Sequence, residues 1–379
     1  MKPRARKSAK LPVSRFLNTE SAAKVGVVVA VCVLGALLFH ALTALSTTTY
    51  ERGIESTVLG IFEKAIPEPE LDKVDYDQRM RNLAHIPAVS ATSTATSTAT
   101  TTPKKQLWPV TDAPYPLPGA LLPFNRILAY YGNFYSTKMG ALGEYPEDQM
   151  LSMLKDEAAR WEAADPSTPV IPAIHYIVET AQGSPGKEGK YMLRMPDTQV
   201  DHAVELAKKV DGIVFLDFQV GLSDIRTEVP MYESYFMRPE VHLGIDPEFY
   251  MKSGDAPGEV VGTMDAADVN WAAEYLAKLV REHDLPPKIL VIHRFTQNML
   301  TNYQDIKPLP EVQIIIEMDG WGEPAKKKNT YARVIAPEPV QFTGFKIFYK
   351  NDLKPPSTRL MTPEEVLSLT PAPIYIQYQ

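Results

Sequence analysis

The amino-acid sequence predicts an α/β protein: a (β/α)8 TIM-barrel-like domain preceded by an N-terminal transmembrane helix and a disordered linker. Three features predict this organisation. An uncharged apolar run lies near the N-terminus, a tract of Ser, Thr and Ala follows it, and eight apolar runs then alternate with helical patterns up to residue 379. Eight strands with intervening helices in about 255 residues match the size of a (β/α)8 barrel.

The uncharged run at residues 25–45, VGVVVAVCVLGALLFHALTAL, has 21 residues and is long enough to cross a bilayer as a helix. Seven cations and one acid precede it. By the positive-inside rule, residues 1–24 form a basic cytoplasmic tail and everything after residue 45 is exported. We predict a single-pass signal-anchor in a bacterial cell membrane, with the C-terminal domain extracytoplasmic; a cleaved signal peptide is the alternative.

Two connecting segments precede the barrel. Residues 46–87 are predicted to form a stalk, because apolar residues recur at helical spacing in its first part. Residues 88–103, AVSATSTATSTATTTP, contain no large side chain after Val89. This segment cannot bury enough apolar surface to offset its ordering entropy, so we predict a disordered linker. The barrel domain then occupies residues 104–379.

Eight apolar runs are predicted to be strands, at residues 126–133, 170–178, 212–219, 241–246, 288–295, 312–318, 342–350 and 373–379. The clearest intervening helices are at residues 146–164, 197–210 and 265–283. Strands that are apolar throughout and alternate with helices indicate a parallel sheet covered on both faces. A doubly wound open sheet is the alternative, although no glycine-rich dinucleotide loop follows the first strand.

Charge argues against one kind of partner, and cysteine content excludes two kinds of cross-link or metal site. The first 24 residues carry a charge of +6, which leaves −13 for the remainder of a chain whose net charge is −7. This acidic portion argues against a nucleic-acid partner. Cys32 is the only cysteine, which excludes an internal disulfide and a cysteine metal cluster.

Acidic side chains accumulate where strands end, which is where barrel enzymes build their sites. They are Asp217 on the third strand, Asp246 and Glu248 after the fourth, and Glu317 and Asp319 on the sixth. Residues two apart on a strand face the same way, so each pair is predicted to point into the barrel. A single Asp at a strand end more often caps a turn. Repetition on several strands predicts a site, and all five acids are candidate catalytic residues.

These acids suit glycoside hydrolysis. Crowded carboxylates raise one another's pKa, which allows one of them to act as a general acid, and glycosidases need a pair of carboxyl groups. Glu248 is the predicted proton donor because it has the longer reach, and Asp246 is predicted to orient it or the substrate. Trp321 is the strongest candidate to line a cleft, because glycines flank it. The candidate substrate-binding residues are Tyr131, His175, Gln219, His293, Trp321, Tyr349 and Gln377.

Several motifs support a resemblance to known barrels. YYG, FLDFQ, IDPEF, VIHRFT and MDGWG resemble segments of uncharacterised barrel domains of bacterial surface proteins, from about residue 126 to the end. More loosely, Asp246-Pro247-Glu248 is similar to the terminal D-x-E of chitinase-like family 18 glycoside hydrolases. That resemblance implies a general acid at Glu248 and an acetamido-orienting Asp246. The earlier acids of the motif are replaced by Leu243-Gly244-Ile245.

The leading hypothesis is a membrane-anchored, extracytoplasmic, glycoside-hydrolase-like barrel that acts on or binds envelope or extracellular glycan, without a cofactor. Its expected partners are the membrane, through the N-terminal helix, and a polysaccharide or other glycan ligand. One alternative is a metal-dependent hydrolase that binds a divalent metal through His175, Asp217, Asp246 and His293. The other is a non-catalytic surface barrel that binds glycan or only builds the envelope.

Overall fold

A computed structural model describes residues 70–87 and 106–379 of the chain, which belong to one compact unit. The predicted tail, transmembrane helix and linker, and most of the predicted stalk, lie outside the described residues. Within residues 70–87 and 106–379, none of the helices combines the length and hydropathy needed to cross a bilayer.

Eight parallel strands close into a barrel, which confirms the predicted fold of this part of the chain. The ring closes because β1 pairs with both β11 and β2. Every strand end lies within three residues of its predicted position. The strands, in their order around the barrel, are β1 (Arg126–Gly132), β2 (Val170–Ala181), β4 (Ile213–Phe218), β5 (Val241–Ile245), β7 (Lys288–Arg294), β9 (Val312–Met318), β10 (Phe342–Ile347) and β11 (Tyr375–Tyr378).

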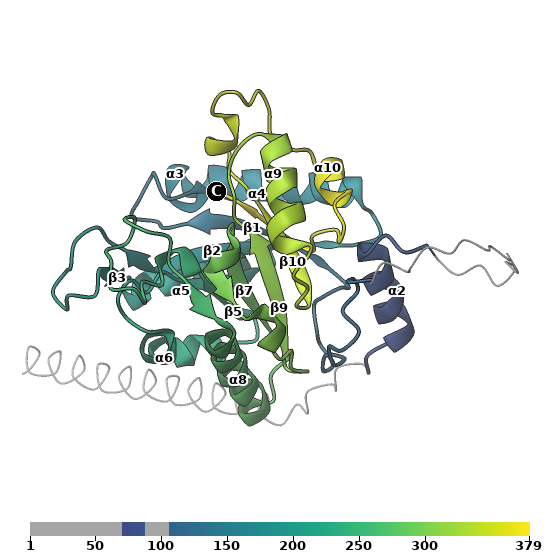
Figure 1. Cartoon of the computed structure of the whole chain (residues 1–379), viewed down its shortest axis with the longest axis horizontal. Coiled ribbons are helices and arrows are strands. Elements are labelled where there is room, and N and C mark those ends of the chain that lie inside the picture. Colours follow the sequence, from purple (N-terminus) through teal and green to yellow (C-terminus); the bar gives the residue numbers. More distant parts are fainter. Residues whose placement is uncertain (1–69, 88–105) are drawn as a thin grey trace, which may run out of the picture. The chain divides into compact units, whose positions relative to one another are not determined.

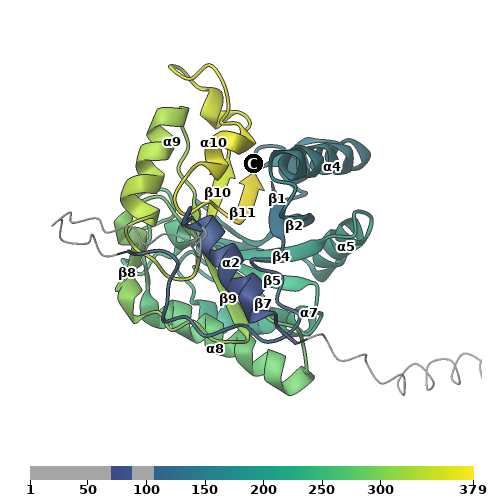
Figure 2. The same ribbon diagram turned by 90° about the vertical axis from the view of Figure 1, so that its right-hand side faces the viewer.

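Helices surround the strands, as Figure 2 shows for α4, α5, α8 and α9. The α-helices of the barrel are α3 (Ala141–Glu144), α4 (Glu147–Ala164), α5 (Asp197–Lys208), α6 (Ile225–Glu228), α7 (Glu233–Phe236), α8 (Ala266–His283), α9 (Pro324–Thr330) and α10 (Pro363–Leu367). The short strands are β3 (Met192–Arg194), which extends β2 as an antiparallel edge, and the pair β6 (Met264–Asp265) and β8 (Leu300–Thr301).

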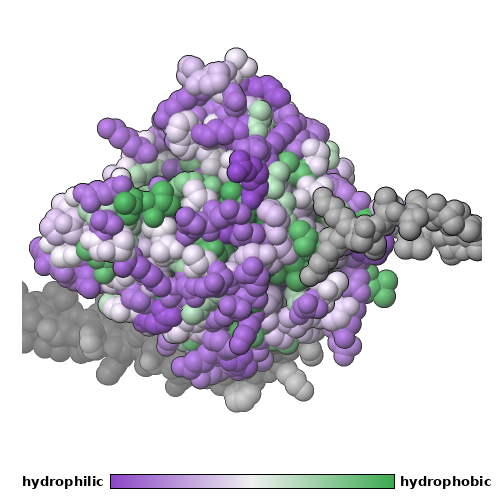
Figure 3. Space-filling view, viewed as in Figure 1, coloured by the Kyte–Doolittle hydropathy of each residue, from purple (hydrophilic) through white to green (hydrophobic). Residues whose placement is uncertain are grey.

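Helix α8 illustrates how local sequence sets these elements. Asp265 and Asp268 form a capping box that satisfies free backbone N–H groups of the first turn. Arg281 and His283 in the last turn complement the helix dipole. The face between these ends buries a stripe of Ala, Val and Leu side chains against the barrel. On the face seen in Figure 3, hydrophilic side chains predominate and hydrophobic ones occur in small groups, because most apolar side chains are inside.

Helix α2 (Lys73–Leu83) covers the amino ends of the strands, opposite β3 in Figure 1 and in front of the barrel in Figure 2. Its Tyr76 and Met80 are buried in the cluster that fills the barrel interior, together with Ile127 and Ile289. Burial of a side chain such as Met80 stabilises the fold by roughly 1.5–3 kcal/mol. This packing corrects the predicted boundary of the stalk: residues 70–87 belong with the barrel.

Candidate active site

A cavity of about 690 Å³ opens at the carboxyl ends of the barrel strands. Its size is that of a typical ligand pocket. Three of the predicted acids line it, namely Asp246, Glu248 and Asp319. The other lining side chains used below are Tyr131, Lys138, Gln219, Phe249, Phe295, Trp321, Lys326, Lys346 and Phe348.

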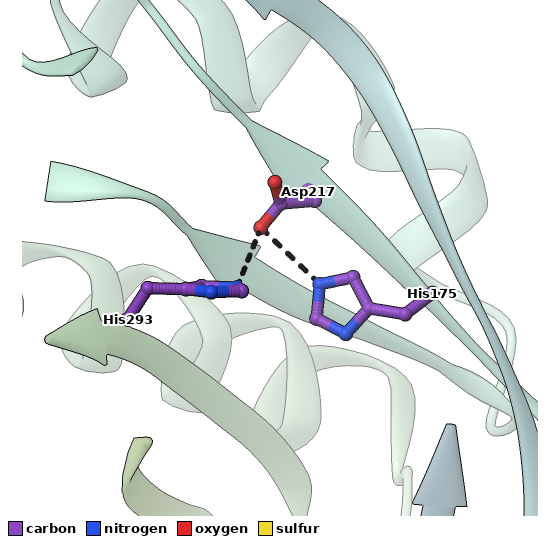
Figure 4. Close-up of side chains that lie close together, drawn as sticks. All are labelled: His175, Asp217 and His293. Carbon is purple, nitrogen blue, oxygen red and sulfur yellow. Dashed lines mark hydrogen bonds and ion pairs between the residues drawn. The ribbon is translucent and has the colours of Figure 1, made fainter. Parts of the chain in front are cut away.

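Asp217, at the end of β4, lies at the centre of a buried polar cluster below the cavity. Its carboxylate accepts a hydrogen bond from the Tyr131 hydroxyl at 2.9 Å. Its Oδ1 is 3.2 Å from His175 Nε2 and 3.3 Å from His293 Nε2 (Figure 4). A Cβ atom on Gly244 of the neighbouring strand β5 would lie 2.4 Å from His175 Nε2 and 2.7 Å from Asp217 Oδ1. The glycine therefore provides the space that this cluster occupies.

Glu317 of β9 and Asp319 just past its end both face His293. Nδ1 of His293 lies 3.0 Å from Glu317 Oε2 and 3.0 Å from Asp319 Oδ2. Lys346, from β10, is 3.2 Å from Asp319 Oδ1 and lies 3.8 Å from the centroid of the Tyr131 ring. Asp319 is thus held between two cations at the floor of the cavity.

Asp246 and Glu248 reach the cavity by a different route from the predicted extended strand. Strand β5 ends at Ile245, and residues Pro247–Phe249 form a short 3-10 turn. Asp246 Oδ1 accepts a hydrogen bond from the Glu248 backbone N–H at 3.1 Å, and its Oδ2 accepts from Gln219 Nε2 at 3.3 Å. Asp246 therefore caps the turn and lines the cavity at once.

The surroundings shift the pKa values of Glu248 and Asp319 in opposite directions. Burial raises the pKa of Glu248, and the negative charge of Asp319 adds to this effect. Burial also disfavours the charged form of Asp319, but the positive charges of Lys346 and His293 outweigh it and lower the pKa of Asp319. Burial raises the pKa of Asp246 well above its ordinary value. One cavity thus holds a carboxyl group that tends to keep its proton and a carboxylate that tends to lose it.

The surroundings also shift the pKa values of the buried groups below the cavity. Burial lowers the pKa of His175 to about 4, so that its imidazole is neutral at physiological pH. Burial opposes protonation of His293 too, but Glu317 and Asp217 outweigh it and raise its pKa well above the ordinary value. Burial raises the pKa of Glu317 to about 7, against the opposing charges of His293 and Lys346.

His175, Asp217 and His293 could hold a metal ion, because one ligand atom from each lies within 4.8 Å of the others. The surroundings of His175 fit a hydrogen-bond network better. Its Nδ1 is 2.5 Å from the Tyr375 hydroxyl and 3.2 Å from Gln377 Nε2. When Nδ1 accepts hydrogen bonds from these donors, Nε2 carries the ring proton and donates a hydrogen bond to Asp217. Nε2 then has no lone pair with which to bind a metal.

The predicted four-residue metal set does not come together as such. Among the described residues, the group that could hold a metal contains His175, Asp217 and His293, and Asp246 lies outside it. Asp246 instead bonds to Gln219 and to the backbone of Glu248.

Three predicted substrate-binding residues differ in their placement. Trp321 is 45% exposed at the rim of the cavity. Gln377 is fully buried and bonds to the Tyr375 hydroxyl at 2.9 Å, beneath the cavity rather than in it. Tyr349 lies away from the cavity: its hydroxyl bonds to Tyr130 at 2.8 Å and its ring stacks on Tyr378 at 5.0 Å. The structure therefore gives Tyr349 a packing role in place of the predicted contact with substrate.

Lys346 is a charged site residue that the sequence did not predict. It lies inside the seventh strand, in the apolar run FTGFKIF, and only 2% of its surface is exposed. A lysine within a strand that is otherwise apolar signals a buried charge that needs a partner. That partner is Asp319.

Glu179, the acid of β2, lies near Glu228 and Arg194. The β2–β4 register shifts between Ile177 and Glu179, and both carboxylate oxygens of Glu179 are buried without a hydrogen-bond partner among the described residues. Arg194 lies 3.9 Å from Glu179 and bonds to Glu228 at 2.7 Å. Burial, with the negative charge of Glu228, raises the pKa of Glu179 to about 10.

We expect Glu179→Gln to stabilise the protein increasingly as pH rises. The folded state keeps a proton that the unfolded chain releases near pH 4.5, so the wild-type free energy of unfolding falls as pH rises from about 4.5 towards 10. The amide is neutral throughout and escapes this loss. Urea unfolding at about pH 5.5 and pH 8.5 measures the difference. Glu188→Gln, which removes an exposed acid bonded to the same Arg194, is the control. A gap between Glu179→Gln and wild type that does not widen with pH contradicts the assignment.

No family model matches the chain, and no curated protein matches it. One similar solved structure is the crystal structure of a ruminal GH26 endo-beta-1,4-mannanase, at 12% sequence identity and a TM-score of 0.33. The match covers 67% of this chain, and this chain spans 58% of the length of that one. At that score the likeness identifies neither a family nor a substrate for this chain.

Proposed function

We propose that this chain is a glycoside hydrolase in which Glu248 is the proton donor and Asp319 the second carboxylate. One observation carries the proposal: the two acids line the same cavity, while their surroundings raise the pKa of Glu248 and lower that of Asp319. Acids whose pKa values are driven apart at one site are suited to the separate acid and base roles.

In the proposed reaction, Glu248 gives its proton to the glycosidic oxygen as the bond to the anomeric carbon breaks. Asp319 faces the developing positive charge on the sugar and either attacks it or takes a proton from the attacking water. Asp246 positions Glu248 through the turn that it caps. Phe249, Phe295 and Phe348 supply apolar walls for sugar rings.

Release of new reducing ends tests the proposal. The purified full chain is incubated with a panel of neutral and acidic polysaccharides, and we expect reducing ends to accumulate from at least one of them. Binding of a polysaccharide without any cleavage would favour the non-catalytic glycan-binding barrel instead.

A metal-dependent hydrolase is the second candidate, and the closeness of His175, Asp217 and His293 favours it. Chelation separates the two functions. If the proposal holds, dialysis against EDTA leaves the rate of glycan cleavage unchanged, and the purified protein contains less than one metal ion per chain. Loss of activity that Zn²⁺ or Mn²⁺ restores would establish the metal-dependent enzyme.

We extend the proposal to location: the barrel acts outside a bacterial membrane to which residues 25–45 anchor it. The uncharged run and the seven cations before it support this. A reporter enzyme that is active only after export is fused behind residue 379, and we expect it to be active. The control fusion lacks residues 25–45 and should be inactive. An inactive full-length fusion that is present at the normal level would contradict the orientation.

A further inference from the structure

Three lysines at the rim of the cavity stand without acidic partners. Lys138 and Lys326 line the cavity, and Lys354 lies beside Trp321 on the same rim. All three are exposed, and none forms an ion pair with a residue in the described part of the chain. Lys350, by contrast, lies four residues before Lys354 and pairs with Glu144.

The indole of Trp321 holds two of these lysines at the rim. The ammonium group of Lys326 lies 4.5 Å from the ring centroid and that of Lys354 lies 5.0 Å from it. Cation–π contacts of this kind contribute roughly 0.5–1 kcal/mol at exposed sites. They reduce the rotamer freedom that an exposed lysine would otherwise lose when it binds a ligand. Two ammonium groups thus lie at one ring, and neither forms an ion pair with a carboxylate in the described part of the chain.

The negative charges within the cavity do not neutralise this rim. Asp319 is already paired with Lys346. Burial raises the pKa of Asp246 well above its ordinary value, which favours its neutral form, and Glu248 has to carry a proton to act as the donor. The rim therefore presents positive charge to an incoming ligand, although the chain as a whole has a net charge of −7.

We propose that the substrate is an acidic glycan, and that Lys326 and Lys354 bind the carboxylate of a uronic acid residue at the cavity rim. This inference rests on the proposed function and narrows its substrate class. A carboxylate that approaches these ammonium groups forms charge-assisted hydrogen bonds, which a neutral sugar alcohol at the same position cannot match. Lys138 adds to the positive field at the rim without a required contact.

Matched oligosaccharides test the substrate class. A β-1,4-mannuronate hexamer is compared with mannohexaose, and a β-1,4-glucuronate hexamer with cellohexaose. Within each pair the two sugars differ only at C6. Binding is measured with the Glu248→Gln full chain so that no ligand is consumed. We expect at least one uronate hexamer to bind about tenfold more tightly than its neutral counterpart at low salt, and to lose most of this preference at about 0.5 M salt.

Substitution of the lysines locates the preference. The double variant Lys326→Gln/Lys354→Gln, in the same background, should lose the preference for uronate and keep its weaker affinity for the neutral hexamer. Lys155→Gln, at an exposed lysine on α4 that does not line the cavity, is the control and should change nothing. Equal binding of neutral and acidic hexamers, failure of every uronate to bind, or an unchanged preference in the double variant would overturn the proposal.

The two proposals fail in different ways. If wild type cleaves neutral hexamers as fast as acidic ones, the acidic substrate is wrong and the hydrolase stands. If acidic hexamers bind through the lysines and wild type never cleaves them, the hydrolase is wrong and the ligand class stands.

Discussion

Replacement of Glu248 by Gln should lower the turnover of a cleaved glycan by about 10²–10⁴-fold while the barrel stays folded and binds its ligand. Gln has nearly the same shape and can still hydrogen-bond to the glycosidic oxygen, but it has no proton to transfer. The raised pKa of Glu248 keeps the wild-type acid protonated at higher pH than a free glutamic acid, so the fall of activity on the alkaline side of the wild-type pH profile should disappear in the variant.

Glu259→Gln is the matched control, because Glu259 is an exposed acid in the segment that follows the same turn. It should cleave the glycan at the wild-type rate. The readouts are initial rates of reducing-end release across the pH range, circular dichroism for the fold, and calorimetry for binding. Full turnover in Glu248→Gln would remove Glu248 from the chemistry and leave Asp246 as a turn cap only.

The barrel could be predicted because its strands are covered on both faces. β7 and β9 are buried along their whole length, and their sequences KILVIHR and VQIIIEM are accordingly almost continuous apolar runs. Helix α2 could not be assigned to the barrel in the same way. Only Tyr76 and Met80 of α2 are buried, and the surface that they cover is formed by the starts of strands far away in sequence.

Strand alternation predicted some of the residues that meet at the candidate site and not others. Asp319 lies just past the end of β9, and its side chain faces His293 as the spacing from Glu317 predicts. Tyr349 lies two residues beyond the end of β10, so alternation no longer decides its direction, and it packs on Tyr378. Lys346 lies within β10 and not after its end, so the pattern of polar groups at strand ends does not include it.

Replacement of Asp217 by Asn should destabilise the protein by about 3–5 kcal/mol near neutral pH, the usual result of removing one partner from a buried ion pair. Asp217, His175 and His293 are fully buried. The amide could still accept from the Tyr131 hydroxyl, but it would carry no charge to compensate His293. Its NH₂ group would face an N–H of that imidazole. Urea unfolding measures the loss, and Asp156→Asn, at an exposed position on α4, is the control and should stay within about 0.5 kcal/mol of wild type.

The pH dependence of this loss identifies its origin. The cationic imidazole of His293 and the His175 hydrogen bond outweigh burial and hold the pKa of Asp217 below its ordinary value, so its stabilising effect is present above the unfolded pKa of about 3.9 and is lost as pH falls below it. The difference in free energy of unfolding between wild type and Asp217→Asn should therefore be constant from about pH 6 to pH 8 and shrink in acid.

A metal held by His175, Asp217 and His293 would give a different result, because EDTA would then destabilise the wild type as much as the substitution does. A wild type that EDTA leaves unchanged, beside a destabilised Asp217→Asn, would assign the cluster to the ion-pair network that supports Asp319. Equal stability of Asp217→Asn and wild type would contradict that assignment.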